Sequence, residues 1–189
     1  EWAKDRAQLW NAVERREDRS NRRDQAQLAR SIELNLPHEL NAEQRRQLVR
    51  DFVREQFVRR GMIADVAIHA PDRHSDDRNY HAHILLTMRP IENGEFAAKK
   101  NRDWNSKELA NHWREKWAEI GARYIEKAGF PKEAERYSYS HLTLPEQKKE
   151  AERRGDHEHA RALDREATTH HGPHVSAMEK RGIETEIGN

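Results

Sequence analysis

Cysteine is absent from the 189 residues of this chain. Without it the protein forms no disulfides and no thiolate metal sites, so any metal ion has to bind through histidine, aspartate or glutamate. The absence also suits a reducing, cytosolic environment.

Hydrophobic residues are few, at 34% of the chain against 37% charged residues. This balance is enough for one modest core with a large solvated surface, so we expect one main domain. No apolar run approaches the roughly 20 residues that cross a bilayer, and the first residues do not resemble a secretion signal. We therefore expect a soluble, cytoplasmic protein.

Positive charge is not in excess, because 35 Lys and Arg face 34 Asp and Glu. Such a protein has no global field that attracts polyanions, so a surface for nucleic acid has to be local. The segment AAKKNRDWN offers one, since cations hold phosphates and aromatic rings stack on bases. Its candidate DNA-binding residues are Lys99, Lys100, Arg102 and Trp104. The alternative is a solvated loop before a helix, with the indole in the core.

Hydrophobic periodicity predicts both helices and strands. Asn41 and Gln44 form a capping box before one predicted helix. Asn105 and Glu108 form another. The predicted helices cover residues 1–19, 41–60 and 105–129, and the predicted strands cover residues 28–36, 62–69 and 81–91. The order strand, helix, strand, strand, helix favours an α+β fold over a purely parallel sheet.

The composition changes after about residue 140. We assign residues 1–140 to the core domain and residues 141–189 to a charged, helical and partly exposed C-terminal region. A late apolar group, formed by Val175, Met178 and Ile183, predicts that the end of the chain docks back on the same domain.

Two histidines stand at the start of the most apolar run, NYHAHILLTM. In a strand, alternate side chains point to opposite faces, so His81 and His83 share one face while the Ala82 and Ile84 side chains face the core. A hairpin with the preceding strand places His69 beside them. The spacing therefore predicts that three imidazoles converge on one point.

Three neutral imidazoles with an open coordination position suit a catalytic divalent cation. Nitrogen ligands favour zinc, nickel, copper or manganese over magnesium alone. The alternative is chance, because a His-x-His pair arises easily in a chain with 12 histidines. On the strand over residues 28–36, Glu33 faces the same side, either as a proton acceptor or orienting residue or as a plain exposed glutamate.

Four blocks resemble the MobA/MobL family of conjugative relaxases, within the HUH endonuclease superfamily. They are IELNLPHEL, then DVAIH followed by NYHAHILLTMRPI, then KKNRDWN, and finally TTHHGPHVSAMEKRGI, in the order that the family uses. Where the family usually has Pro-His-x-His, this chain has Tyr80 before His81, and its loop from His69 to His81 is longer. Neither difference removes a candidate ligand.

The resemblance implies a palm-like antiparallel sheet flanked by helices. It implies that His69, His81 and His83 hold a divalent metal ion (manganese, magnesium or zinc) against the scissile phosphate of single-stranded DNA. Such enzymes nick one strand at a plasmid transfer origin through a tyrosine nucleophile and later rejoin the ends. The pattern makes Glu33 an aid to the nucleophile, and it places His170, of the His-x-Gly-Pro block, against DNA or the active site.

The implied setting is the bacterial cytoplasm, and the implied partners are transfer-origin DNA, relaxosome accessory proteins and a type IV secretion coupling protein. The family's tyrosine lies on a helix near the N-terminus, a position that none of the four tyrosines here occupies. We therefore expect a fragment that forms no covalent DNA adduct by itself. The alternatives are a non-catalytic single-strand DNA-binding or relaxosome module and a rolling-circle replication initiator.

Overall fold

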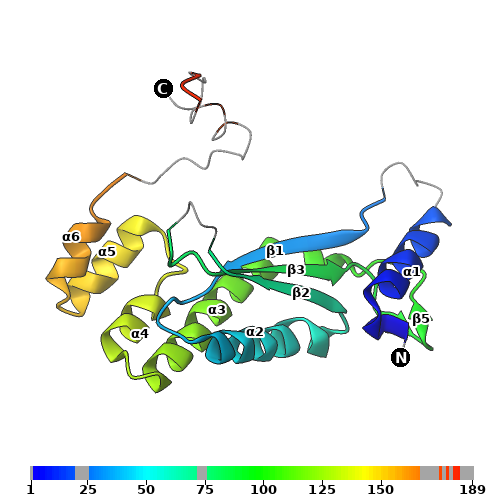
Figure 1. Ribbon diagram of the computed structural model, residues 1–189, viewed down its shortest axis with the longest axis horizontal. Helices are drawn as coiled ribbons and strands as arrows, with labels where there is room; N and C mark the ends of the chain where they lie inside the picture. Colours follow the sequence, from blue (N-terminus) through cyan, green and yellow to red (C-terminus); the bar gives the residue numbers. More distant parts are fainter. Residues whose placement is uncertain are drawn as a thin grey trace. The chain divides into compact units, whose positions relative to one another are not determined.

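The computed structural model describes residues 2–19, 26–71, 76–166, 175, 178 and 181–183 (Figure 1). The chain divides into two compact units, residues 1–141 and residues 142–189. None of the helices in the described part combines the length and the apolar surface that a bilayer crossing requires.

The first unit is built on a three-stranded antiparallel sheet. Its strands are β1 (Ala29–Asn35), β2 (Ala64–His69) and β3 (His81–Thr87), in the order β1-β3-β2, with β3 in the centre. A second, two-stranded sheet pairs β4 (Ile91–Glu92) with β5 (Glu95–Phe96). The predicted α+β class, an antiparallel sheet flanked by helices, is confirmed.

Two helices cover one face of the larger sheet, α2 (Ala42–Gln56) and α3 (Lys107–Lys127) (Figure 1). The inward side chains of β3 are Ala82, Ile84 and Leu86, and all three are fully buried against this layer. Alternation therefore leaves the other face of β3 to the histidines. This apolar layer determines which way the candidate site faces.

The helix starts show one correct prediction and one error. Asn41 and Gln44 form the expected capping box of α2, with reciprocal hydrogen bonds of 2.8 and 2.9 Å. The cap predicted at Asn105 is wrong, because that residue ends the 3-10 turn η4 (Arg102–Asn105). The N-cap of α3 is Ser106, whose hydroxyl accepts a 3.0 Å hydrogen bond from the N–H of Leu109.

The sequence did not predict α4 (Pro131–Ser138), which follows α3 after a turn at Gly129, where φ is 95°. Pro131 stands in the first turn of α4, where its missing N–H costs nothing. The ring of Tyr137 packs so closely on Gly121 of α3 that a Cβ there would collide with it. This close approach holds α4 against α3.

In the second unit, α5 (Leu144–Arg153) and α6 (His157–Leu163) bury Ala151, Ala160 and Leu163. A 2.9 Å ion pair joins Lys148 to Asp164. The docking of the chain's C-terminal end on the first domain stays a prediction.

An ion pair fastens α1 (Arg6–Asp18) to the segment that follows β3. The buried carboxylate of Glu17 accepts a 2.6 Å hydrogen bond from Arg89 and lies 3.3 Å from the Lys100 ammonium. Arg89 also donates to the carbonyls of Ala97 and Ala98. Burial by itself raises the pKa of Glu17. The hydrogen bond and charge of Arg89, together with the charge of Lys100, lower it by more, so the pKa of Glu17 lies below its ordinary value.

Replacing this carboxylate tests the attachment of α1. We expect Glu17→Gln to lower the free energy of unfolding by about 3 kcal/mol at neutral pH, because Arg89 loses its buried counter-ion. The folded-state pKa of Glu17 lies below the ordinary value of 4.5, so the ion pair stabilises the fold above that pH and is lost as pH falls through the folded pKa. The two proteins should therefore converge in acid.

Urea unfolding across a pH series measures this difference. Glu14→Gln, an exposed site on the same helix, is the matched control and should behave as the original protein. A stability deficit of Glu17→Gln that stays constant down to acid pH would contradict the assignment.

Candidate metal centre

Three histidines come together on the exposed face of the sheet, at the end where β2 finishes and β3 begins. His69 is directly opposite His81 in the β2–β3 ladder, and His83 is opposite Ala67. Antiparallel register places directly opposed side chains on the same face. The convergence that the sequence predicted is present in the structure.

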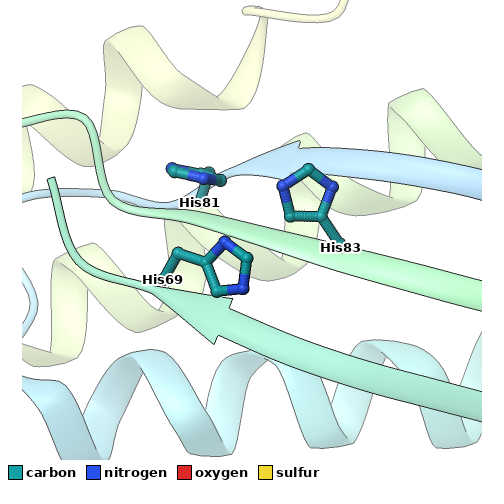
Figure 2. Close-up of side chains that lie close together, drawn as sticks. All are labelled: His69, His81 and His83. Carbon is teal, nitrogen blue, oxygen red and sulfur yellow. The ribbon is translucent and has the colours of Figure 1, made fainter. Parts of the chain in front are cut away.

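The three rings surround one point above the strands, as Figure 2 shows. Their centroids are 5.2 Å apart for His69 and His81, 5.0 Å for His69 and His83, and 5.2 Å for His81 and His83. One nitrogen from each ring lies within 4.8 Å of the others. His69 is exposed, and the two residues of β3 are half-buried.

A backbone contact sets the tautomer of one ring. Nδ1 of His81 lies 3.0 Å from the carbonyl oxygen of Asn79. A carbonyl only accepts, so Nδ1 carries the hydrogen and donates, which leaves Nε2 with a lone pair. A carbonyl that fixes a ligand ring in this way is the usual support of a metal-binding histidine.

The donor set fits a divalent cation of the borderline class. Nitrogens that bind zinc lie about 2.1 Å from it and so about 3.4 Å from one another in a tetrahedral site, and small ring rotations bring nitrogens within 4.8 Å to that spacing. Asp65, four residues before His69 on the same face of β2, is engaged elsewhere, because its carboxylate accepts hydrogen bonds from Arg6 at 2.8 Å and from Trp10 at 3.0 Å. The three imidazoles therefore leave coordination positions open toward solvent.

Glu33 lies beside this cluster rather than in it. Its partner across the β1–β3 ladder is His83, so the carboxylate shares the histidine face. The side chain is exposed and lines a cavity of about 850 Å³ along the outer edge of β1. This position suits an orienting or proton-accepting group at the edge of the cluster.

The predicted DNA-binding segment divides into free and engaged residues. Lys99 and Arg102 are exposed. Lys100 is held by Glu17 and donates a 2.6 Å hydrogen bond to the carbonyl of Gln27. The indole of Trp104 is 5% exposed and belongs to the core, which stands against a base-stacking role.

His170 lies outside the described residues. Its predicted contact with DNA or with the active site stays a prediction.

The cavity along β1 contains arginines that the sequence analysis did not select. Arg30 and Arg114 line it together with Trp113, and the Arg30 guanidinium lies 5.6 Å from the centroid of that indole. A signal was available, because Arg30 occupies an inward position of the strand alternation that Ile32 and Leu34 otherwise fill. A charge in an apolar series of this kind indicates a partly open edge.

Comparisons with known proteins identify the family of this chain. The family model described as "MobA/MobL family" matches residues 1–150. Conjugal transfer protein TraA of Agrobacterium fabrum is 43% identical over 92 residues, which are 49% of this chain and 8% of that protein. Mobilization protein MobL of Acidithiobacillus ferridurans is 28% identical over 206 residues, which cover 94% of this chain and 48% of that protein. The chain thus spans less than half the length of either relative.

A solved structure, described as "Molecular Basis of Vancomycin Resistance Transfer in Staphylococcus aureus", superposes with a TM-score of 0.58. It is 36% identical, and the match covers 68% of this chain and 64% of that one. Fold and site define an α+β protein with a histidine cluster on the open face of an antiparallel sheet. The family match over most of its length shows that the chain belongs to the MobA/MobL family.

Metal titration tests the cluster without reference to catalysis. We expect the chain to bind Mn²⁺, Co²⁺ or Zn²⁺ with a stoichiometry of one by isothermal calorimetry. His83→Ala should weaken binding by at least about tenfold, because one of three ligand nitrogens is lost. His38→Ala removes an exposed histidine outside the cluster and should leave the affinity unchanged. Equal affinity in the two variants would show that the ion binds elsewhere.

Proposed function

We propose that this chain carries the metal-binding part of a conjugative DNA relaxase, an enzyme that nicks one DNA strand at a plasmid transfer origin and rejoins it. The observation that carries the proposal is the convergence of His69, His81 and His83 on the open face of β2 and β3. Membership of the MobA/MobL family and relatives named for conjugal transfer and mobilization support it.

The histidines are the residues that would hold a divalent cation. When bound, the cation supplies Lewis-acid polarisation of a phosphodiester oxygen and helps to orient the phosphate. The protein's contribution is rigidity, because two of the ligands share the central strand and the ring of His81 is oriented by the Asn79 carbonyl. Orienting contacts of this type keep the ligand nitrogens directed at the same point.

Glu33 is the proposed proton acceptor or orienting group. Its cross-strand position next to His83 keeps a carboxylate on the reacting face, while its exposure leaves it accessible to a nucleophile's hydroxyl. A tyrosine hydroxyl with an ordinary pKa near 10 needs such an acceptor at neutral pH.

Lys99 and Arg102 are the proposed phosphate contacts. Both side chains are exposed, and neither has a carboxylate partner among the described residues. Cations on the DNA backbone provide affinity that depends on salt and not on sequence. Lys100 supports this segment from within, through its contacts with Glu17 and with the Gln27 carbonyl.

The nucleophile is not one of the tyrosines in this chain. Tyr80 packs on the core side of the sheet, and the Cζ atom of Arg45 lies 3.5 Å from the centroid of the Tyr80 ring. Tyr124 donates to Asp51, and burial with this hydrogen bond raises its pKa to about 12. The Tyr139 side chain is buried.

Burial likewise raises the pKa of the fourth tyrosine, Tyr137, which packs on α3. A raised pKa means less phenolate at neutral pH, so the hydroxyls of Tyr124 and Tyr137 are both weakened as nucleophiles. We infer that the catalytic tyrosine belongs to another segment or another chain.

Nicking by the full-length gene product tests the function. A supercoiled plasmid that carries the element's own transfer origin should be converted to the open circle only with a divalent cation. His81→Ala combined with His83→Ala should reduce this conversion by at least about a hundredfold, since the ligand set is removed. His38→Ala is the control. Undiminished nicking by the double variant would refute the role of the cluster.

The isolated chain should form no covalent adduct with DNA. A single-stranded transfer-origin oligonucleotide, incubated with the chain and Mn²⁺, is expected to give no protein-DNA band that survives denaturation, because its tyrosines are unsuited to attack. The full-length gene product in the same gel is the positive control. An adduct that Tyr137→Phe or Tyr124→Phe abolishes would overturn this inference.

A further inference from the structure

A groove runs along the outer edge of β2, on the face of the sheet opposite the histidines. It has a volume of about 470 Å³ and lies between α2, the 3-10 turn η3 (Val58–Arg60) and β2. Val58, Val66 and Ile68 line it and are 48%, 37% and 41% exposed. Exposed aliphatic side chains gathered in one groove, with charges around them, are typical of an interaction surface.

The backbone of β2 is open along the same edge. The N–H of Thr87 donates a 3.0 Å hydrogen bond to the carbonyl of Ile63, and the N–H of Ile63 donates one of 3.0 Å to the Thr87 hydroxyl, so the backbone groups of these two residues point toward each other. Antiparallel alternation then turns the N–H and C=O groups of Ala64, Val66 and Ile68 away from β3. No strand in the described part of the chain pairs with this side of β2.

Natural edge strands are usually protected against pairing by lysine, proline or a bulge. The sequence of β2, ADVAIH, contains neither lysine nor proline. Its register with β3 is continuous from Ala64 to His69, without a bulge. The edge therefore keeps the features that accept an added strand.

Arginines of α2 give the groove a positive charge. Arg46, Arg50 and Arg54 line it and are exposed. Arg46 forms an ion pair with Glu43, whereas no carboxylate in the described part of the chain pairs with Arg50 or Arg54. Residues four apart rise about 6 Å along a helix, and alternate residues of a strand advance about 6.6 Å. Groove-facing side chains of an added strand are therefore spaced nearly as these arginines are, so a carboxylate among them lies within reach of two neighbouring arginines.

We propose that the outer edge of β2 binds an extended segment of a partner protein. The side chains of this segment that face the groove alternate between acidic and aliphatic. The segment adds to the sheet as a further strand through the outward backbone groups of Val66 and Ile68. Its aliphatic side chains cover the exposed valines and isoleucine, and its carboxylates pair with Arg50 and Arg54. The surface is separate from the histidine face, so this assignment does not depend on the relaxase function.

Other occupants fit the groove less well. A second copy of this chain would bring its own row of α2 arginines against the first, and like charges in contact oppose association. Single-stranded nucleic acid binds through bases stacked on aromatic rings as well as through phosphates, and the floor of this groove is aliphatic. Charge and shape together favour an acidic peptide segment.

Fluorescence anisotropy with a labelled peptide tests the proposal. The probe is a peptide of about nine residues. Every second residue is threonine, and the residues between are alternately glutamate and valine. A matched probe has lysine in place of each glutamate. We expect saturable binding of the glutamate peptide to the chain, and binding of the lysine peptide that is at least about tenfold weaker.

Two changes to the protein separate charge from backbone pairing. Arg50→Glu with Arg54→Glu should weaken binding at least about tenfold. The matched control is Arg15→Glu with Arg19→Glu, two exposed arginines on and after α1 that change the net charge equally. Val66→Pro removes an outward N–H without removing a bond to β3, and should also weaken binding at least about tenfold while the circular dichroism spectrum is kept.

Three outcomes would overturn the proposal. One is the absence of saturable binding of the glutamate peptide at millimolar concentration. Another is binding that the Arg50 and Arg54 reversal leaves unchanged. The third is displacement of the peptide by a single-stranded oligothymidine that itself loses affinity on this reversal, which would make the groove a nucleic-acid surface.

Discussion

The antiparallel pairing of β2 with β3 is the constraint on which the candidate site depends. Its register sets His69 directly opposite His81, and alternation along β3 adds His83 to the same face. The register is fixed from the other side of the sheet, where Ala82, Ile84 and Leu86 have to meet α2 and α3. A slip of one residue would turn the histidine of β2 toward the helices and the apolar side chains of β2 toward the exposed face of the sheet. Core packing and the convergence of the three histidines are thus two consequences of one pairing.

The elements that the sequence predicted well are those with a long and regular pattern. Strand alternation located β1, β2 and β3, and helical periodicity located α1, α2 and α3, because each of these elements buries one continuous apolar face. Short elements escaped for a physical reason. The helix α4 has eight residues, and its packing on Gly121 through Tyr137 joins residues far apart in sequence. The β4–β5 hairpin has only two residues in each strand, too few to show a period.

The candidate site was accessible to sequence reasoning in part. Alternation and a hairpin suffice to bring three histidines together, and both are local properties of the chain. Trp104 and Lys100 show the limit of that reasoning. A basic and aromatic segment next to a strand resembles a DNA-binding loop, but the indole is buried in the core and the ammonium is held by Glu17, which lies on α1. Only the tertiary fold distinguishes a cation that supports a loop from one that faces a phosphate.

The strand β2 differs from β3 in a way that links the two faces of the sheet. β3 is paired on both sides, so its two histidines stand on a backbone restrained from each neighbour, whereas β2 is paired on one side and its histidine is exposed. Edge strands have fewer backbone bonds to lose and open more easily than central strands. Of the three candidate ligands, His69 therefore has the least restrained backbone, and its placement depends most on the pairing of β2. A strand added at the outer edge would restrain that same backbone, so occupation of the groove and order in the histidine cluster would be connected through β2 rather than through a shared ligand.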